Sequence, residues 1–283
     1  MPAMAPLGRS SLLWRYAGDW RSMLPGISTG LLQLMDPALG AGVTEQSAIF
    51  TEPFERIYRS VPQIWAVIFE PEGGGRGRSI RDIHRSFKGV DADGRRYHAL
   101  DPDTFWWAHA TFTWDIFRSV DLFHPGRLSA ADREQLYAET VTWYSRYGMS
   151  MRPVPATHDA FVAEFRRLCV ERLERTPAVA RALELAASGS AALPIDVPVI
   201  GSLAGPVFTP GARNLAFGCL PRVVRERFDI PWSATDRLAF TAFATAVRNG
   251  FRFVPYPINA WTFQTAQRAV GARTRRQRIR PAA

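Results

Sequence analysis

Cysteine is scarce in this chain, with two residues among 283, and neither lies in a disulfide or metal-binding pattern. Cys169 falls on a helical apolar stripe with Phe161 and Phe165, and Cys219 is equally isolated among apolar neighbours. Two such cysteines supply neither a disulfide framework nor the paired spacing of a zinc site. We therefore expect both to be small core residues of a protein in a reducing compartment.

Long hydrophobic runs are also lacking. No stretch of about eighteen consecutive apolar residues occurs, and Met1–Gly8 has too few apolar residues for the core of a secretory leader. The apolar segment 193–208 is interrupted by prolines and glycines, so we expect a packed loop or a lid there. These absences predict a cytoplasmic protein without a transmembrane segment, and they leave peripheral membrane contact and the oligomeric state open.

Motifs of three common functional classes are not expected either. We expect no nucleophile elbow of a hydrolase, and the sequence has no HExxH motif, no CxxC pair and no combination of two cysteines with histidine at zinc spacing. The triplet Gly73–Gly75 lacks the GxGxxG or Walker spacing of a phosphate-binding loop. The sequence therefore supports neither a zinc enzyme nor a hydrolase nor a nucleotide-binding protein.

Lysine is almost absent, since Lys88 is the only one, and the formal net charge of +9 therefore comes from arginine. The arginines are scattered through the predicted helices, except in the segment from Arg273 to Arg280. Basic charge permits contact with nucleic acid or an anionic membrane, so a nucleic-acid-binding helical protein is one rival hypothesis. Because no recognisable nucleic-acid-binding module occurs, we expect no such partner and predict that residues 271–283 form a solvated, disordered tail.

The remaining composition suits a globular helical protein. Hydrophobic residues make up 47% of the chain and aromatic residues 12%, enough for a sizeable core. Apolar residues recur with a helical period, and cap and stop residues separate the periodic segments. Helices are predicted at residues 26–34, from 60 or 62 to 73, at 79–87, at 101–120, at 129–148, from 157, at 177–189, at 213–227 and at 233–249. We predict an all-α fold with one multi-helix domain over residues 1–270 and at most a short hairpin, near Arg95–Leu100.

Two of the five histidines lie on the apolar faces of consecutive predicted helices. A helix opened by Ser79 places His84 in its inward stripe, and a helix opened by Asp101 places His109 in line with Phe105. Both imidazoles are therefore expected to point at the core. A buried imidazole needs a hydrogen-bond partner or a metal ion.

The residues alone leave three explanations of these histidines open. Each histidine can bond to a carbonyl or hydroxyl group in an ordinary packed core. The pair could hold one metal ion with a carboxylate, but neither histidine stripe carries an acidic residue, which argues against a non-haem iron site. A single helix-borne imidazole facing a pocket of Phe, Trp and Ile side chains suits axial ligation of haem iron.

A series of short segments, in a fixed order and spacing, carries a family resemblance. These are Tyr16–Arg21, Leu31–Gln33, Gly40–Val43, Pro53–Ser60, His84, Gly89, Gly94–Tyr97, Asp101–Pro102, Trp107–Thr111, Tyr137, Glu139 and Gly148, with weaker matches at Leu220–Pro221 and Arg225. Together they resemble the latex-clearing-protein (rubber oxygenase) and MpaB-type oxygenase family. The resemblance implies an all-α, globin-like helical core around a haem pocket, with haem b and its iron as the cofactor. It also implies an enzyme that uses O₂ to oxidise or cleave a carbon–carbon double bond of a small apolar, isoprenoid-like substrate.

The same resemblance assigns roles to individual residues. His84 would be the proximal ligand of the haem iron. Arg56 and Arg59 would pair with haem propionates, although Arg59 can equally form a surface salt bridge. Ser60 would supply a hydroxyl group close to the haem, or it only caps a helix. Arg59 departs from the rubber-cleaving members, which have a lysine there, and because a guanidinium is too basic to coordinate iron we expect no distal ligand from it.

His109 and Asp36 complete the comparison with the family. For His109 we favour a catalytic supporting role beside the haem over simple packing against Tyr97 or Thr113. Asp36–Pro37 is a second departure, because many members have His-Pro there. The alternative to an oxygenase is a helical protein that binds haem or an apolar ligand without catalysis, and alkene turnover with stoichiometric O₂ uptake would separate the two.

Overall fold

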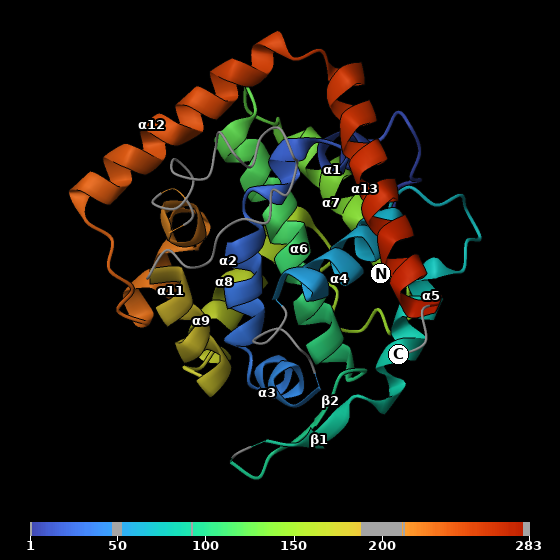
Figure 1. Ribbon diagram of the computed structural model, residues 1–283, viewed down its shortest axis with the longest axis vertical. Helices are drawn as coiled ribbons and strands as arrows, with labels where there is room; N and C mark the ends of the chain where they lie inside the picture. The colour runs from blue at the N-terminus through green and yellow to red at the C-terminus, as the bar shows by residue number, and fades with distance from the viewer. Residues whose placement is uncertain (1, 47–52, 92, 188–210, 212, 280–283) are drawn as a thin grey trace.

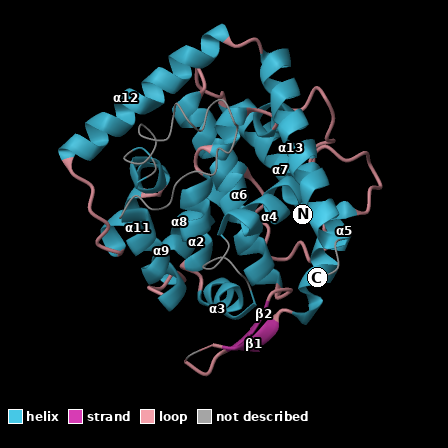
Figure 2. Cartoon of the chain, in the orientation of Figure 1, coloured by secondary structure: helices cyan, strands magenta, loops and turns pink. Residues whose placement is uncertain are grey.

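The computed structural model describes residues 2–46, 53–91, 93–187, 211 and 213–279. These residues are mainly helical, and the strands among them form one short hairpin (Figure 2). In chain order the elements are α1 (Leu12–Ala17), the 3₁₀ helix η1 (Trp20–Met23), α2 (Gly26–Leu34), α3 (Pro37–Gln46), α4 (Pro53–Ala66), α5 (Arg76–Ile83), η3 (His84–Ser86), β1 (Lys88–Val90), β2 (Arg96–His98), α6 (Pro102–Phe123), α7 (Ala130–Ser145), α8 (His158–Glu171), α9 (Pro177–Ala187), α11 (Arg222–Arg227), α12 (Ala234–Gly250), η4 (Phe251–Phe253) and α13 (Tyr256–Ile279). The predicted all-α fold with a short hairpin is confirmed.

Helix α6 runs through the middle of the molecule, and the other helices surround it (Figure 1). The side chain of Asp101 caps its first turn by accepting hydrogen bonds from the backbone N–H groups of Asp103 and Thr104, at 3.0 and 3.1 Å. Pro102 follows at the first helical position, where its missing N–H is harmless. Helices α1, α2, η1 and α12 pack against α6, and Trp107 on α6 is fully buried. The helix that carries His109 is therefore the centre of the core.

Side-chain caps begin three further helices where the sequence predicts them. Ser129 and Ser233 each form a capping box with the aspartate three positions later, at the starts of α7 and α12. The hydroxyl of Thr157 accepts a hydrogen bond from the N–H of Ala160 at the start of α8. These predicted starts are confirmed.

The hairpin pairs β1 and β2 in antiparallel register, with Gly89 opposite Tyr97. Gly94 has φ +80°, in the left-handed region that glycine adopts readily, so the chain can turn between the strands. The ring of Tyr97 is buried, and its hydroxyl donates a hydrogen bond of 2.5 Å to Glu45 on α3. The hairpin is thereby fastened to the helical body.

Two predicted helix boundaries are wrong. Helix α5 begins at Arg76, not at Ser79, because the Ser79 hydroxyl donates to the carbonyl of Gly75 within the helix instead of capping its start. The helix expected at 213–227 is broken at Pro221, so that residues 213–219 are helical and α11 starts at Arg222. Proline has no N–H and disfavours helical geometry in the residue before it, which explains the break.

Two other regions are more helical than expected. Helix α4 begins at Pro53 and contains Pro62 inside it, ahead of the predicted start at Ser60 or Pro62. Helix α13 was not predicted, and its backbone is helical to Ile279, which corrects the expected disordered tail over residues 271–279. Arginine, alanine and glutamine favour helix intrinsically, so a basic segment need not be disordered. The segment 193–208, expected to be a packed loop or a lid, lies outside the described residues.

Both cysteines are buried and free of disulfide bonds, as predicted. Burial raises the pKa of the Cys169 and Cys219 thiols to about 12, so neither is a reactive thiolate near neutral pH. Within the described part of the chain, no helix is both long and apolar enough to span a membrane.

Candidate functional site

His84 lies where α5 passes into the 3₁₀ helix η3, and its ring is half-buried. Its Nδ1 atom lies 2.8 Å from the carbonyl oxygen of Ile80, one helical turn earlier. A carbonyl oxygen can only accept a hydrogen bond, so Nδ1 carries the proton and the lone pair of the neutral ring is on Nε2. Histidines that bind metals through Nε2 have this tautomer, with Nδ1–H held by a protein oxygen.

The ring of His84 lies at the edge of the core, which modifies the expectation that it points inward. Phe87 and Phe105 contact the ring edge-on, with centroid distances of 5.2 and 6.3 Å. Ile83, from the same predicted stripe, is 56% exposed. The tighter 3₁₀ turn that begins at His84 changes the spacing of residues along the helix, so the stripe does not continue on one buried face.

Close backbone packing holds α5 against the turn that follows α7. A Cβ atom at Gly77 would lie 2.4 Å from the carbonyl oxygen of Arg146, so a larger residue would force the helix away. The guanidinium of Arg81 donates to the carbonyl of Gly148 at 3.3 Å. Arg146 itself donates to the carbonyl of Val67, after α4, at 2.7 Å. These contacts fix the helix that ends at His84 relative to α4 and α7.

His109 is buried in the middle of α6. Its Nε2 donates to the carbonyl oxygen of Thr140 on α7 at 3.0 Å, and the ring of Trp143 lies 4.6 Å away, centroid to centroid. The structure thus gives this imidazole the carbonyl of Thr140 and aromatic rings as contacts, whereas the packing alternative named Tyr97 or Thr113. Burial lowers the pKa of His109 to about 3, so the ring is neutral near pH 7.

Ring contacts join the two histidines into one aromatic cluster, defined here as His84, Phe105, Tyr144, Tyr147 and His109. His109 lies 5.0 Å from Tyr144 and 6.1 Å from Tyr147, centroid to centroid. Tyr147 lies 5.4 Å from Phe105, which contacts His84. Sequence periodicity gives a face of a helix and not its partner, so it does not indicate these contacts of Tyr144 and Tyr147.

The low pKa of His109 predicts acid destabilisation. In the unfolded chain His109 binds a proton below its ordinary pKa of 6.5, whereas in the folded protein it stays neutral down to about pH 3. The folded state is therefore destabilised as the pH decreases through this range. His109 should therefore lower the free energy of unfolding by about 1.4 kcal/mol per pH unit, or about 2–3 kcal/mol at about pH 4.5. Urea unfolding of the wild type and of His109→Gln at about pH 7.5 and about pH 4.5 measures this, because glutamine can still donate to Thr140 but does not titrate. Equal losses of stability in the two proteins would contradict the assignment.

Arg56, Arg59 and Ser60 lie on α4, which packs against α5. The structure describes only the backbone at Arg56 and Arg59, whereas Ser60 is half-buried. With 3.6 residues per turn, positions 56, 60 and 63 share one side of the helix. Gln63 on that side accepts a hydrogen bond of 2.7 Å from Arg76, the first residue of α5. The fold thus brings the helix with the three predicted residues beside the helix that leads to His84.

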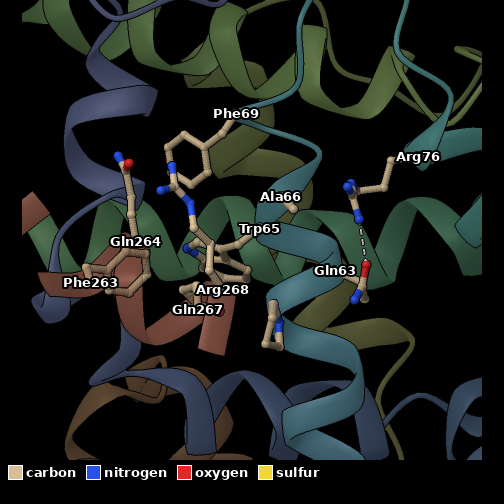
Figure 3. Close-up of a pocket in the computed structure, with 10 residues that line it drawn as sticks. Gln63, Trp65, Ala66, Phe69, Arg76, Phe263, Gln264, Gln267 and Arg268 are labelled. Atoms are coloured by element: carbon tan, nitrogen blue, oxygen red, sulfur yellow. Dashed lines mark hydrogen bonds between the residues drawn. The ribbon is translucent and has the colours of Figure 1, made fainter. Parts of the chain in front are cut away.

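A small cavity of about 180 Å³ lies between α4 and α13 (Figure 3). Trp65, Phe69 and Phe263 supply its apolar walls, and Arg268 and Gln63 lie at its polar side. Pockets for drug-sized ligands start at about 300 Å³, so this cavity suits only a small molecule or part of one.

A larger cavity of about 630 Å³ lies between α6, α8 and α11. Trp114 and Phe165 form part of its wall, with their rings stacked 4.7 Å apart, and Arg118 and Arg225 lie around it. Its volume is in the range of ligand pockets. His84 and His109 line neither of the two cavities.

One sequence pattern resembles a catalytic motif but has a structural role. Residues Gly26–Gly30 match the letters of the GxSxG nucleophile elbow, which corrects the expectation that the sequence contains no such pattern. Ser28, however, lies inside α2, is 2% exposed, and donates its hydroxyl to the carbonyl of Ala216 at 2.6 Å. A serine held in this way is not an exposed nucleophile, so the structure supports no hydrolase.

Asp36, noted above as a departure from the resemblance, also has a structural role. Its side chain accepts a hydrogen bond of 2.9 Å from the N–H of Leu39 at the start of α3, and it forms an ion pair with Arg172 of α8. Arg172 additionally donates to Thr104 on α6 at 3.2 Å. Among the residues that the structure describes, no three His, Cys, Asp or Glu side chains come together as a metal site.

Comparison with protein families identifies the family to which this chain belongs. The family described as "ER-bound oxygenase mpaB/B'/Rubber oxygenase, catalytic domain" matches residues 14–249. Comparisons with curated proteins and with solved structures found no match. The matched range includes both α4 and α5, the aromatic cluster and all of α6. Because the match covers well over half of the chain, this protein belongs to the mpaB and rubber oxygenase catalytic-domain family and is an oxygenase of that family.

Proposed function

We propose that the protein is a haem b-dependent oxygenase that uses O₂ to cleave a carbon–carbon double bond of an apolar, isoprenoid-like substrate. The observation that carries the proposal is the hydrogen bond of 2.8 Å between Nδ1 of His84 and the carbonyl of Ile80. This bond gives Nε2 the lone pair that an axial iron ligand needs.

The set of donor groups favours haem over a metal held by side chains alone. A half-buried imidazole on a helix end can supply one ligand, and no cluster of three metal-binding side chains occurs in the part of the chain described above. A haem supplies four nitrogen ligands from its macrocycle, so a single protein imidazole is enough to hold its iron. The bound haem would supply the iron that activates O₂.

The other predicted residues have supporting roles in this proposal. Arg56 and Arg59 on α4 would pair with the haem propionates, since a guanidinium binds a carboxylate through two parallel hydrogen bonds. Ser60 would offer a hydroxyl group to the haem or to bound substrate. His109 is neutral and is hydrogen-bonded to the carbonyl of Thr140. It would act through the aromatic cluster by holding Tyr144 and Tyr147 in place. These tyrosines lie behind Phe105, whose ring contacts His84.

The environment of His84 also supports an apolar substrate. Phe87 and Phe105 are its ring neighbours, and such surfaces orient hydrocarbon chains by shape and exclusion of water. Cleavage of one double bond by one O₂ places one oxygen atom on each carbon and leaves two carbonyl groups, so the reaction balances without another reductant. We further propose that residues 1–270 work as one oxygenase domain, and that the two free thiols indicate a cytoplasmic location.

Haem titration of the purified protein, followed by oxygen uptake, tests this function. We expect a saturable Soret band at one haem per chain, and consumption of one O₂ per double bond lost when an isoprenoid alkene is added. Carbonyl products measured by mass spectrometry should match the O₂ consumed. Stoichiometric haem binding without O₂ uptake would indicate a haem carrier, and failure to bind haem would reject the proposal altogether.

A further inference from the structure

The net charge of the chain is confined to its last sixth. All 26 acidic residues lie within residues 1–236, together with 26 of the 35 basic residues. Residues 237–283 contain no aspartate or glutamate and hold the other nine basic residues, all arginine. Residues 237–283, which begin inside α12 and include α13, thus account for the entire formal charge of +9, and residues 1–236 are neutral.

Exposed apolar side chains gather in the same region. We define the aromatic corner as Trp20, Phe253, Val254, Tyr256, Ile258 and Trp261. Phe253 is 88% exposed, Trp261 68% and Ile258 54%, and every residue from 252 to 258 is exposed. The corner lies at the outer edge of the molecule, where α12 meets α13 (Figure 1). Large apolar side chains so exposed and so close together mark an interaction surface.

The aromatic corner is held firmly from behind. Asn259 is 2% exposed and its side chain accepts a hydrogen bond of 3.3 Å from the N–H of Trp20. Phe263 is fully buried and contacts the ring of Trp20 edge-on at 5.3 Å. The indole N–H of Trp20 donates to Thr262 at 3.0 Å. Since α13 is anchored through this inner face, the outer face displays Ile258 and Trp261 to solvent on a fixed support.

Two arginines lie at the aromatic corner. Arg252 is exposed next to Phe253, and the guanidinium of Arg15 lies 5.7 Å from the ring centroid of Tyr256. The nearby Asp19 is 1% exposed and is paired with Arg21 at 2.6 Å, so it does not offset this surface charge. The corner therefore combines aromatic rings with positive charge and with no exposed acidic residue from α12 or α13.

We propose that the aromatic corner binds the surface of an anionic phospholipid bilayer. Tryptophan, tyrosine and phenylalanine insert at the boundary between headgroups and acyl chains, and arginines attract anionic headgroups. A second copy of the chain fits less well, because a two-fold symmetric contact would place arginines against arginines. Corner residues 253–261 follow the family match at 14–249, whereas Trp20 lies inside it, so most of this surface lies outside the matched domain. The proposal does not depend on haem, although an oxygenase of apolar substrates would gain access to them at a membrane.

Flotation of the full chain with lipid vesicles tests this proposal. We expect binding to vesicles with about 30% phosphatidylserine, little binding to pure phosphatidylcholine, and weaker binding when salt rises from about 0.1 to about 0.5 M. The double variant Phe253→Ser/Trp261→Ser should lose at least ~10-fold in vesicle affinity, because two exposed rings no longer insert. Arg252→Glu should weaken binding to the anionic vesicles without changing binding to neutral ones.

Leu238→Ser is the matched control, since Leu238 is 72% exposed near the opposite end of α12. This variant should bind vesicles like the wild type, and all variants should retain the wild-type circular dichroism and haem titration. Equal vesicle binding by the wild type and the double variant would overturn the proposal. A second outcome would also overturn it. In that outcome the wild type does not bind vesicles, but it binds a single-stranded oligonucleotide or forms a dimer, and the double variant loses this interaction.

Discussion

His84→Ala is expected to lower haem affinity by at least ~100-fold and to abolish haem-dependent oxygen uptake. Removing even a group that only orients a metal ligand commonly lowers metal affinity by about 10–100-fold, so removal of the ligand itself should do more. Because His84 is half-buried and its ring hydrogen bond is to a carbonyl of its own helix, the substitution should leave the fold intact. Haem titration, with circular dichroism to check the fold, measures the effect.

Added imidazole makes the test of His84 more specific. A free imidazole can occupy the space left by the side chain and restore an axial nitrogen, so we expect part of the Soret band and of the oxygen uptake to return. His98→Ala is the control, because His98 is exposed on β2 of the hairpin that follows His84. Unchanged haem binding in His84→Ala would move the iron ligand to another residue, and equal losses in His98→Ala would indicate a general disturbance of this region.

The starts of the central helices were predictable because local chemistry decides them. The caps at Asp101, Ser129 and Ser233 satisfy backbone N–H groups that have no partner inside the helix, and this requirement is visible in a few adjacent residues. The burial of His109 was predictable for a similar reason, since α6 is long and its apolar period is regular.

The contacts of the site were not predictable in this way. The hydrogen-bond partner of His109 is a backbone carbonyl of α7, 31 residues along the chain. Every residue has a backbone carbonyl, so the sequence does not indicate which one the histidine contacts. The face presented by His84 depends on a change from α to 3₁₀ geometry at that residue, which periodicity cannot indicate. Helix α13 begins at the Tyr256–Pro257 pair and exposes Ile258 and Trp261 on its outer face, so it lacks the amphipathic pattern from which a helix is usually inferred.

The role of Asp36 becomes clear only from its contacts in the structure. From the sequence, aspartate in place of histidine appeared only as the loss of a group from the haem site. In the structure this carboxylate is fully buried, accepts a hydrogen bond from Leu39 and pairs with Arg172, so it joins α3 to α8. The pairing explains why the position tolerates a charge in the core.

Arg172→Ala should accordingly destabilise the fold by about 3–5 kcal/mol, because it leaves the buried carboxylate of Asp36 without its counter-charge. Urea unfolding near neutral pH measures the loss. Arg167→Ala, one turn earlier on α8, is the matched control: its side chain is 51% exposed and its pairs with Glu164 and Glu171 are on the surface, so the loss should be below about 1 kcal/mol.

The double variant Asp36→Asn/Arg172→Ala identifies the cause of that instability. Asparagine can still accept the hydrogen bond from Leu39 but carries no charge, so the double variant should be more stable than Arg172→Ala alone. If loss of the hydrogen bond from the guanidinium to Thr104 were the main effect, the second substitution would recover nothing. Recovery of stability would therefore show that the uncompensated buried charge of Asp36 is what destabilises Arg172→Ala.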